Sequence, residues 1–225
     1  MSEMGFSEEL QAENRVLWDK ILGHQFIVEL GSGMLPLEKF TYYVKQDYLY
    51  LVDFARCIGL AAVKAGDVED MRGWAGMMEG CLRYEMDMLE DISGRLGISK
   101  AEIVDAERAP TNLAYLNHLL GVAYSGAFGE IVSSLLPCMW TYVDVGVLFS
   151  EMGGYRGHPV YMEWCEAYGA SEYSELVQAY IDALDGFAVI SGKYMRDRMR
   201  DCFHRSLRYE YLFWEMAYNM EQWMV

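Results

Sequence analysis

The chain contains little proline, little histidine and an odd number of cysteines. Four of its 225 residues are proline, four are histidine and five are cysteine, and the cysteines form no C-x-x-C pair. This pattern favours free thiols in a reducing compartment over a disulfide framework or a zinc knuckle. We therefore expect a cytoplasmic protein that holds no metal ion and needs no cofactor.

Basic residues are also scarce. Eighteen Lys and Arg residues stand against 34 Asp and Glu residues, which gives a net charge of −16. Such a surface repels the phosphates of nucleic acids and an anionic membrane leaflet, so we expect neither as a partner. The acidic first residues contain no apolar run typical of a signal peptide, and no later stretch offers about 18 uncharged apolar residues in a row.

Apolar and aromatic residues are abundant. Hydrophobic residues make up 53% of the chain, with 16 Met, 17 Tyr and 6 Trp, which excludes a disordered chain and provides material for a large core. The apolar residues recur at three- and four-residue intervals, without strand alternation, an internal repeat or a long linker. The sequence predicts an all-α protein, one helical bundle that spans residues 1–225 as a single domain.

Helix boundaries are marked by capping residues, prolines and glycines. We expect a first helix with an N-cap at Ser7, a linker at 98–109 and a loop in the segment GGYRGHP. The expected helices run from Ser7 to about Gly23, Pro36 to Gly66, Asp67 to about Gly94 or Gly97, Pro110 to about Gly129, from there to about Gly153, from Pro159 to about Ser171, and as two segments within 171–223.

Two acids and a thiol fall on apolar helix stripes. These stripes face the core, where charged side chains are not expected. Asp47 continues the stripe of the 36–65 helix, Glu210 that of the last helix, and Cys138 lies one turn before Tyr142 on a third. A buried carboxylate without a partner costs several kcal/mol, roughly, unless hydrogen bonds or a ligand offset that cost. The pattern therefore predicts a polar pocket inside the bundle, with tyrosines such as Tyr50 near it.

Each of these residues also has a structural interpretation when it is taken alone. A free cysteine packs like a small hydrophobe, and a buried acid can be bonded to a tyrosine or an arginine. Glu85 lies in an apolar register too, on the stripe of Trp74, Met78 and Leu82, and we take it as a structural control. A basic run indicates a solvated helix face or a subunit contact rather than a phosphate site; it consists of Lys193, Arg196, Arg200, His204 and Arg208.

Three separated segments carry a resemblance to a known family. These are FTYYVKQDYLYL at 40–51, LLPCMWTYVDVG at 135–146 and YEYLFWEMAY at 209–218. They are similar in order and spacing to the signature segments of the thiaminase II, or TenA-like, proteins, and the resemblance covers nearly the whole chain. It implies a haem-oxygenase-like helical bundle, assembled as a homotetramer.

The resemblance also implies an activity in thiamin salvage. The family converts 4-amino-5-aminomethyl-2-methylpyrimidine to the hydroxymethylpyrimidine with release of ammonia, and cleaves thiamin. Cys138 matches the family's nucleophile and Glu210 its acid/base. The pyrimidine-binding set is matched by Asp47, Tyr50, Tyr115, Tyr142 and Tyr168.

These residue types suit that chemistry. A thiolate that adds to a ring carbon, with protonation of a ring nitrogen, makes the pyrimidine electron-rich enough to expel a group from its methylene carbon. One carboxylate can protonate the departing ammonia and then activate water, while a second pairs with the amidine edge between aromatic faces. Pro137 removes a backbone hydrogen bond next to Cys138, and we expect the resulting kink to tilt the thiol toward the pocket.

Two other classes of function stay open on the residues alone. A haem-dependent oxygenase would use a histidine near the N-terminal helices, and His24 lies there. A di-iron site is not one of these open classes, because it would need paired Glu-x-x-His motifs and the sequence offers only a single Asp201-x-x-His204. A non-catalytic pyrimidine-binding or regulatory protein could have the same pocket, although such a protein has no need of a thiol opposite an acid.

Overall fold

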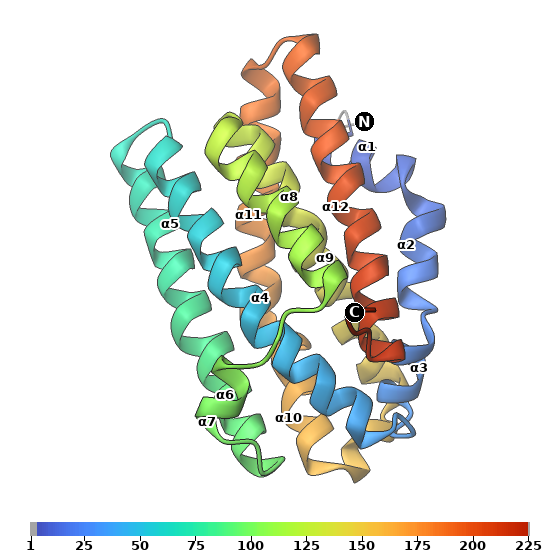
Figure 1. Cartoon of the computed structure of the whole chain (residues 1–225). Coiled ribbons are helices and arrows are strands. Elements are labelled where there is room, and N and C mark those ends of the chain that lie inside the picture. Colours follow the sequence, from blue (N-terminus) through green and yellow to red (C-terminus); the bar gives the residue numbers. More distant parts are fainter. Residues whose placement is uncertain (1–3, 225) are drawn as a thin grey trace.

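The structure, a computed structural model, describes residues 4–224, and every regular element in that range is a helix (Figure 1). Two are not α-helical: η1 is a π-helical turn and η2 a 3₁₀ turn. The elements are α1 Phe6–Glu13, α2 Arg15–Leu22, α3 Gln25–Gly31, α4 Leu37–Lys64, α5 Val68–Gly80, η1 Cys81–Glu85, α6 Met86–Arg95, α7 Lys100–Val104, α8 Pro110–Ser125, α9 Phe128–Met152, η2 Gly154–Gly157, α10 Pro159–Tyr168, α11 Ser171–Ile190 and α12 Lys193–Asn219.

The long helices run side by side along the length of the bundle (Figure 1). Helix α9 packs against α8, α11 and α12, and α4 packs against α5, α8, α9 and α12. Aromatic rings fill the space between α4, α9 and α12, where Tyr43 and Trp214 stack with centroids 5.5 Å apart. The three helices on whose stripes we placed Asp47, Cys138 and Glu210 therefore meet in the core.

Most of the expected helix starts are confirmed. Pro36 is the N-cap of α4, and Pro110 and Pro159 open α8 and α10. The Asp67 carboxylate accepts 2.9 Å hydrogen bonds from the backbone N–H groups of Glu69 and Asp70, which caps α5.

The N-terminal helix differs from the expectation because it is divided into α1 and α2 at Asn14. Its side-chain amide donates to the carbonyl of Leu10 at 2.8 Å, and its side-chain oxygen contacts His204 of α12. Such local hydrogen bonding competes with the regular helix. The cap also differs: Gly5 precedes α1, while the Ser7 hydroxyl is buried and donates to Asp185 at 2.8 Å.

Two further differences lie between residues 80 and 109. The helix that follows Asp67 is interrupted by the π-helical turn η1, and the expected linker contains the short helix α7, capped by Ser99. The buried stripe differs by one residue at this point, because Cys81, seven residues after Trp74, is buried, whereas Leu82, which we expected on the stripe, is 41% exposed.

A close approach of α9 and α10 fixes Tyr168 near the core. A Cβ atom on Gly146 would lie 2.4 Å from the carbonyl oxygen of Tyr168, so only glycine fits at this crossing. Helix α9 is also long and apolar enough to span a membrane by length and composition, but 67% of its most apolar window is buried inside the bundle. Its apolar character is therefore accounted for by packing within the core.

Candidate active site

Cys138, Glu210 and Tyr115 meet between α8, α9 and α12. The Tyr115 hydroxyl donates a 2.7 Å hydrogen bond to the Glu210 carboxylate, and the Cys138 thiol lies near enough for the Glu210 charge to act on its pKa. Glu210 is 3% exposed and Tyr115 is fully buried, whereas Cys138 is half-buried. A thiol is thus placed beside a carboxyl group that can accept its proton.

Burial governs the protonation of this pair. Removal from water raises the pKa of Glu210 to about 8, and the hydrogen bond from Tyr115 counteracts that rise in part. Burial also raises the pKa of the Cys138 thiol well above its usual value, with the Glu210 charge adding to the rise. The thiol is therefore protonated at neutral pH, and it becomes a thiolate by passing its proton to a base within reach.

Asp47 lies in a second hydrogen-bonded group, between α4 and α9. The Tyr43 hydroxyl donates to the Asp47 carboxylate at 3.0 Å, and Tyr142 donates to Tyr43 at an oxygen–oxygen distance of 2.9 Å. Burial raises the pKa of Asp47 to about 7, and the Tyr43 hydrogen bond opposes that rise. A carboxyl group with this pKa can hold or release a proton near neutral pH.

Tyr168 connects this group to Glu85. The ring of Tyr168 packs edge-on against Tyr142, with centroids 4.8 Å apart. Burial raises the pKa of Glu85 to about 8, the nearby Asp47 charge adds to the rise, and a hydrogen bond from Tyr168 opposes it. Three carboxyl groups, Asp47, Glu85 and Glu210, therefore share one interior region.

The Tyr50 hydroxyl makes no hydrogen bond of good geometry with any described residue. It is buried beside the Cys138 thiol and the Tyr115 hydroxyl, and its residue is 2% exposed, yet it makes no well-formed hydrogen bond. An unsatisfied buried hydroxyl costs about 1–3 kcal/mol, so its position suits a ligand that supplies the missing partner.

The seven site residues expected from the sequence thus lie together in the fold. Three neighbouring residues were not expected in this site. Tyr43 lies one turn before Asp47 on the same stripe, a spacing that could have identified it. Tyr173 was not considered, and Glu85 was treated as a control outside the site, although it lines a cavity of about 220 Å³ together with Tyr84, Tyr168 and Tyr173.

Comparison with known proteins places this arrangement in a family. The profile of the TENA/THI-4/PQQC family matches residues 11–220. The chain is 34% identical over 220 residues to the aminopyrimidine aminohydrolase of Halalkalibacterium halodurans, with 98% of each chain covered. The chain belongs to the TENA/THI-4/PQQC family.

Solved structures agree with this assignment. A TenA homologue from P. horikoshii OT3 superposes with a TM-score of 0.88 at 31% identity, covering 96% of this chain and 99% of the other. A domain with a haem-oxygenase-like fold from Shewanella denitrificans superposes with a TM-score of 0.75 at 15% identity, covering 97% and 94%. The expected fold class is therefore confirmed.

His24 is not available as an iron ligand in this member of the TENA/THI-4/PQQC family. Its Nδ1 accepts a hydrogen bond from the backbone N–H of Phe26 at 3.1 Å, which caps α3, and its Nε2 lies 3.3 Å from the Glu215 carboxylate. Both ring nitrogens are engaged. Within residues 4–224, no three His, Cys, Asp or Glu side chains are grouped as a metal site would require.

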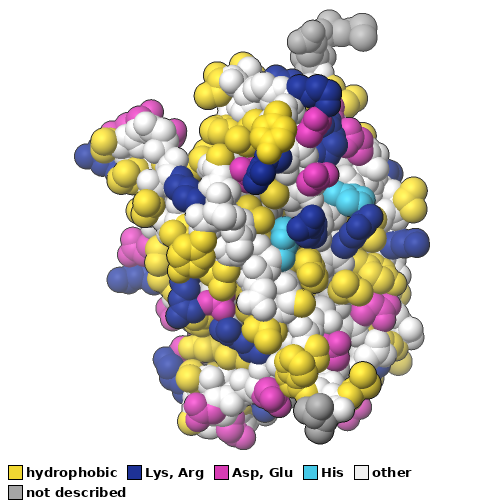
Figure 2. Space-filling view, turned by 45° about the horizontal axis from the view of Figure 1, so that its top comes forward, with side chains coloured by type: hydrophobic (Ala, Val, Ile, Leu, Met, Phe, Trp, Pro, Cys, Tyr) yellow, Lys and Arg dark blue, Asp and Glu magenta, His cyan; other side chains and the backbone are white. Residues whose placement is uncertain are grey.

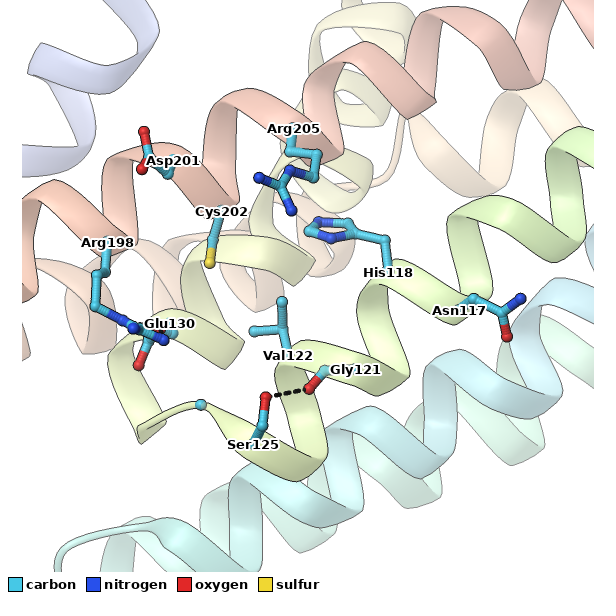
Figure 3. Close-up of a pocket in the computed structure, with 11 residues that line it drawn as sticks. Asn117, His118, Gly121, Val122, Ser125, Glu130, Arg198, Asp201, Cys202 and Arg205 are labelled. Atoms are coloured by element: carbon cyan, nitrogen blue, oxygen red, sulfur yellow. Dashed lines mark hydrogen bonds and ion pairs between the residues drawn. The ribbon is translucent and has the colours of Figure 1, made fainter.

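A larger cavity of about 460 Å³ opens between α8, the start of α9 and α12 (Figure 3). Its charges balance, because Arg198 and Arg205 are offset by Glu130 and Asp201, and Arg198 is bonded to Glu130 at 2.6 Å. Figure 3 shows His118 and Arg205 pointing toward each other, and the Arg205 charge together with burial lowers the pKa of His118 to about 4. This cavity also holds a thiol, Cys202, but its carboxylate Glu130 is paired with Arg198, whereas no basic side chain pairs with Glu210 among the described residues.

The basic run on α12 is largely paired within the chain. Lys193 bonds Asp197 at 2.6 Å, Arg200 bonds Glu13 at 2.8 Å, and Arg196 donates to the carbonyl of Ala188 at 2.8 Å. Figure 2 shows basic and histidine side chains interspersed with acidic ones on this face. The pairing accords with the expected solvated face or subunit contact.

Proposed function

We propose that this chain is an aminopyrimidine aminohydrolase of thiamin salvage, which converts 4-amino-5-aminomethyl-2-methylpyrimidine and water to the hydroxymethylpyrimidine and ammonia and also cleaves thiamin. The observation that carries the proposal is the placement of the Cys138 thiol near the buried Glu210 carboxylate, to which Tyr115 donates a 2.7 Å hydrogen bond. The names of relatives such as the H. halodurans enzyme support it.

The first step is addition of sulfur to the ring. The Cys138 proton moves to Glu210 as the new carbon–sulfur bond forms, and Asp47, whose pKa is about 7, supplies a proton to a ring nitrogen. The ring then carries the electron pair that it needs to expel the substituent. Asp47 pairs with the amidine edge of the pyrimidine, and Tyr50, Tyr115, Tyr142 and Tyr168 form the polar and aromatic walls.

The second step exchanges ammonia for water. The carbon–nitrogen bond breaks and the ammonium group leaves as ammonia, which then takes the proton that Glu210 received from the thiol and departs as an ammonium ion. A water molecule then adds to the exocyclic carbon and gives a proton to Glu210. Asp47 then takes back the proton on the ring nitrogen, and the carbon–sulfur bond breaks, which restores the aromatic ring. Glu210 returns its proton to the Cys138 sulfur.

We also propose a homotetramer in the cytoplasm. Val189, Ile190 and Tyr194, at the turn between α11 and α12, are 77%, 81% and 72% exposed, which suits burial against another subunit. Five unpaired thiols suit a reducing compartment.

Product analysis tests the activity. The purified protein is incubated separately with the aminomethylpyrimidine and with thiamin, and the hydroxymethylpyrimidine is quantified by chromatography. We expect turnover with both compounds. Binding of the pyrimidine without formation of product would instead favour the non-catalytic binding protein.

A further inference from the structure

Glu85 ends the π-helical turn and faces a cavity that opens to solvent. The turn η1, Cys81–Glu85, interrupts an otherwise continuous helix, and such interruptions redirect side chains at functional sites. The cavity of about 220 Å³ is lined mainly by apolar and aromatic groups, and its only charged lining residues among those described are Glu85 and Glu172. The described lining thus offers two acids and no basic group that would repel a cation, and its walls are aromatic.

The aromatic walls are the rings of Tyr168 and Tyr173, with Tyr84 at the rim. Tyr168 and Tyr173 meet edge to face with centroids 5.0 Å apart, and Tyr84 is 80% exposed. Aromatic faces beside a carboxylate are the usual surroundings of a bound organic cation.

Tyr173 also joins this cavity to the thiol. Its hydroxyl donates to the sulfur of Met139, the residue after Cys138, at 3.6 Å. Burial raises the pKa of Tyr173, and the Glu85 charge adds to the rise. The cavity shares Tyr168 with the candidate active site and is joined through Tyr173 to Met139 beside Cys138.

Glu85 differs from the buried acids that serve structure alone. Asp53 is paired with Arg56 and Arg108, and Glu130 with Arg198. No ion pair joins Glu85, Asp47 or Glu210 to a basic side chain among the described residues, so the protein supplies these acids with no counter-charge. The unpartnered Tyr50 hydroxyl, 2% exposed beside Cys138, independently marks the inner end of this region as a place for a ligand.

We propose that Glu85, together with Tyr168 and Tyr173, forms a subsite for the positively charged leaving group of the substrate, an alkylammonium or a quaternary heterocycle, and so determines specificity for cationic substituents. This inference rests on the proposed function. With one ring carbon at Cys138 and its amidine edge at Asp47, a bulky substituent needs space beyond the ring. The Glu85 cavity offers such space next to the ring site, because Tyr168 lines the cavity and packs against Tyr142.

The subsite also favours release of product. The aminomethyl substrate is an ammonium ion near neutral pH, because alkylamines titrate near 10, roughly. The hydroxymethyl product is neutral and loses the attraction to Glu85. The carboxylate therefore discriminates between substrate and product by charge, in addition to any contact with the ring.

A pair of ligands that differ in this charge tests the proposal. In a Cys138→Ser background, which prevents turnover, calorimetry measures the Kd of the aminomethylpyrimidine and of the hydroxymethylpyrimidine at pH 8.5, above the pKa of about 8 of Glu85, with and without Glu85→Gln. We expect Glu85→Gln to weaken binding of the cationic ligand by roughly tenfold or more, the range of a hydrogen-bonded charge pair. Binding of the neutral ligand should change by less than about twofold, since no charge interaction is lost.

Two further variants make the comparison specific. Asp87→Asn removes an exposed acid two residues along the same helix and should leave both affinities unchanged, because solvent screens its charge. Glu85→Asp keeps a carboxylate and should retain part of the preference for the cation. If Glu85→Gln folds poorly, the Kd values of the two ligands for Glu85→Asp provide a second test of the subsite.

The outcomes separate this inference from the proposed function. Equal losses for both ligands, or no loss for the cation, while the hydroxymethyl compound still binds, would overturn the role of Glu85 and leave the proposed function standing. If neither pyrimidine binds the Cys138→Ser protein, the proposed function fails and the subsite fails with it.

Discussion

Tyr115 donates a 2.7 Å hydrogen bond to Glu210 across the interface of α8 and α12. This bond fixes one oxygen of a carboxyl group that the Cys138 thiol also contacts, and it favours the ionised form that burial opposes. Glu210 therefore has a pKa of about 8, at which it can both accept and donate a proton near neutral pH. Its position suits a group that acts twice in one turnover.

Replacing Glu210 by glutamine removes that proton transfer and keeps the shape of the side chain. We expect Glu210→Gln to lower kcat by roughly two to four orders of magnitude, the usual contribution of a general acid–base group, with little change in pyrimidine affinity. Steady-state kinetics and calorimetry with the hydroxymethyl product measure the two effects. A loss of affinity as large as the loss of rate would assign Glu210 to binding instead.

Asp47 is expected to act on binding in addition to the proton that it supplies to the ring. Asp47→Asn replaces an acceptor by an amide with both donors and an acceptor, which mismatches the amidine edge of the pyrimidine. We expect Kd for the hydroxymethyl product to rise by roughly tenfold or more, the cost of one unpaired charged hydrogen bond. Tyr43→Phe removes the 3.0 Å hydrogen bond to Asp47 and should produce a smaller change in the same direction.

Much of this site could be predicted from the sequence because helical periodicity determines which residues point inward. Asp47 and Glu210, placed on inner stripes by spacing alone, are 4% and 3% exposed. The same reasoning failed at one position of its stripe, because Leu82 at the π turn is 41% exposed while the preceding Cys81 is buried. Periodicity also says nothing about which stripes meet, so the contact of Tyr168 with Glu85 required the three-dimensional structure.

The shifted carboxyl groups predict a pH-dependent stability. Asp47, Glu85 and Glu210 titrate near 4, roughly, in an unfolded chain, but at about 7, 8 and 8 in the fold. The folded protein binds more protons between these values. Their contribution to stability is therefore complete below about pH 4 and is lost as the pH rises toward 8.

Glu210→Gln removes one of these shifted carboxyl groups and leaves the rest of the net charge of −16 in place. The comparison therefore separates the contribution of Glu210 from the general charge repulsion. We expect the ligand-free variant to melt roughly 2–4 °C or more above the parent at pH 8.5, which corresponds to about 1 kcal/mol or more for a protein of this size. The difference should close near pH 5, where Glu210 is protonated in the parent. Differential scanning calorimetry over this range measures it, and a constant difference would contradict the shifted pKa.

Assembly is a separate prediction. The exposed apolar side chains at the α11–α12 turn, together with the family resemblance, lead us to expect four subunits of 25.9 kDa each. Light scattering coupled to size exclusion measures the mass. A monomer would contradict the tetramer, and a double substitution of Val189 and Ile190 by serine should weaken assembly if this turn is buried between subunits.

Cys138→Ser tests the step on which the proposed reaction depends. Serine is nearly isosteric with cysteine, but its hydroxyl is far less acidic and a poorer nucleophile toward a ring carbon. The variant should fold, assemble and bind the hydroxymethylpyrimidine with an affinity close to that of the parent. Its turnover of the aminomethyl substrate should be undetectable, and a fully active variant would make Cys138 a core residue without a chemical role.

Alkylation by iodoacetamide examines the same thiol in the parent protein. Cys138 and Cys202 are partly exposed, whereas Cys57, Cys81 and Cys165 are buried. We expect inactivation to follow modification of Cys138 and to accelerate as the pH rises, because the raised pKa of this thiol leaves little thiolate at neutral pH. Bound hydroxymethylpyrimidine should slow modification of Cys138 and leave that of Cys202 unchanged, since Cys202 lines the other cavity. Peptide mapping with and without the product follows both sites, and protection at Cys202 alone would place the pyrimidine away from Cys138 and Glu210.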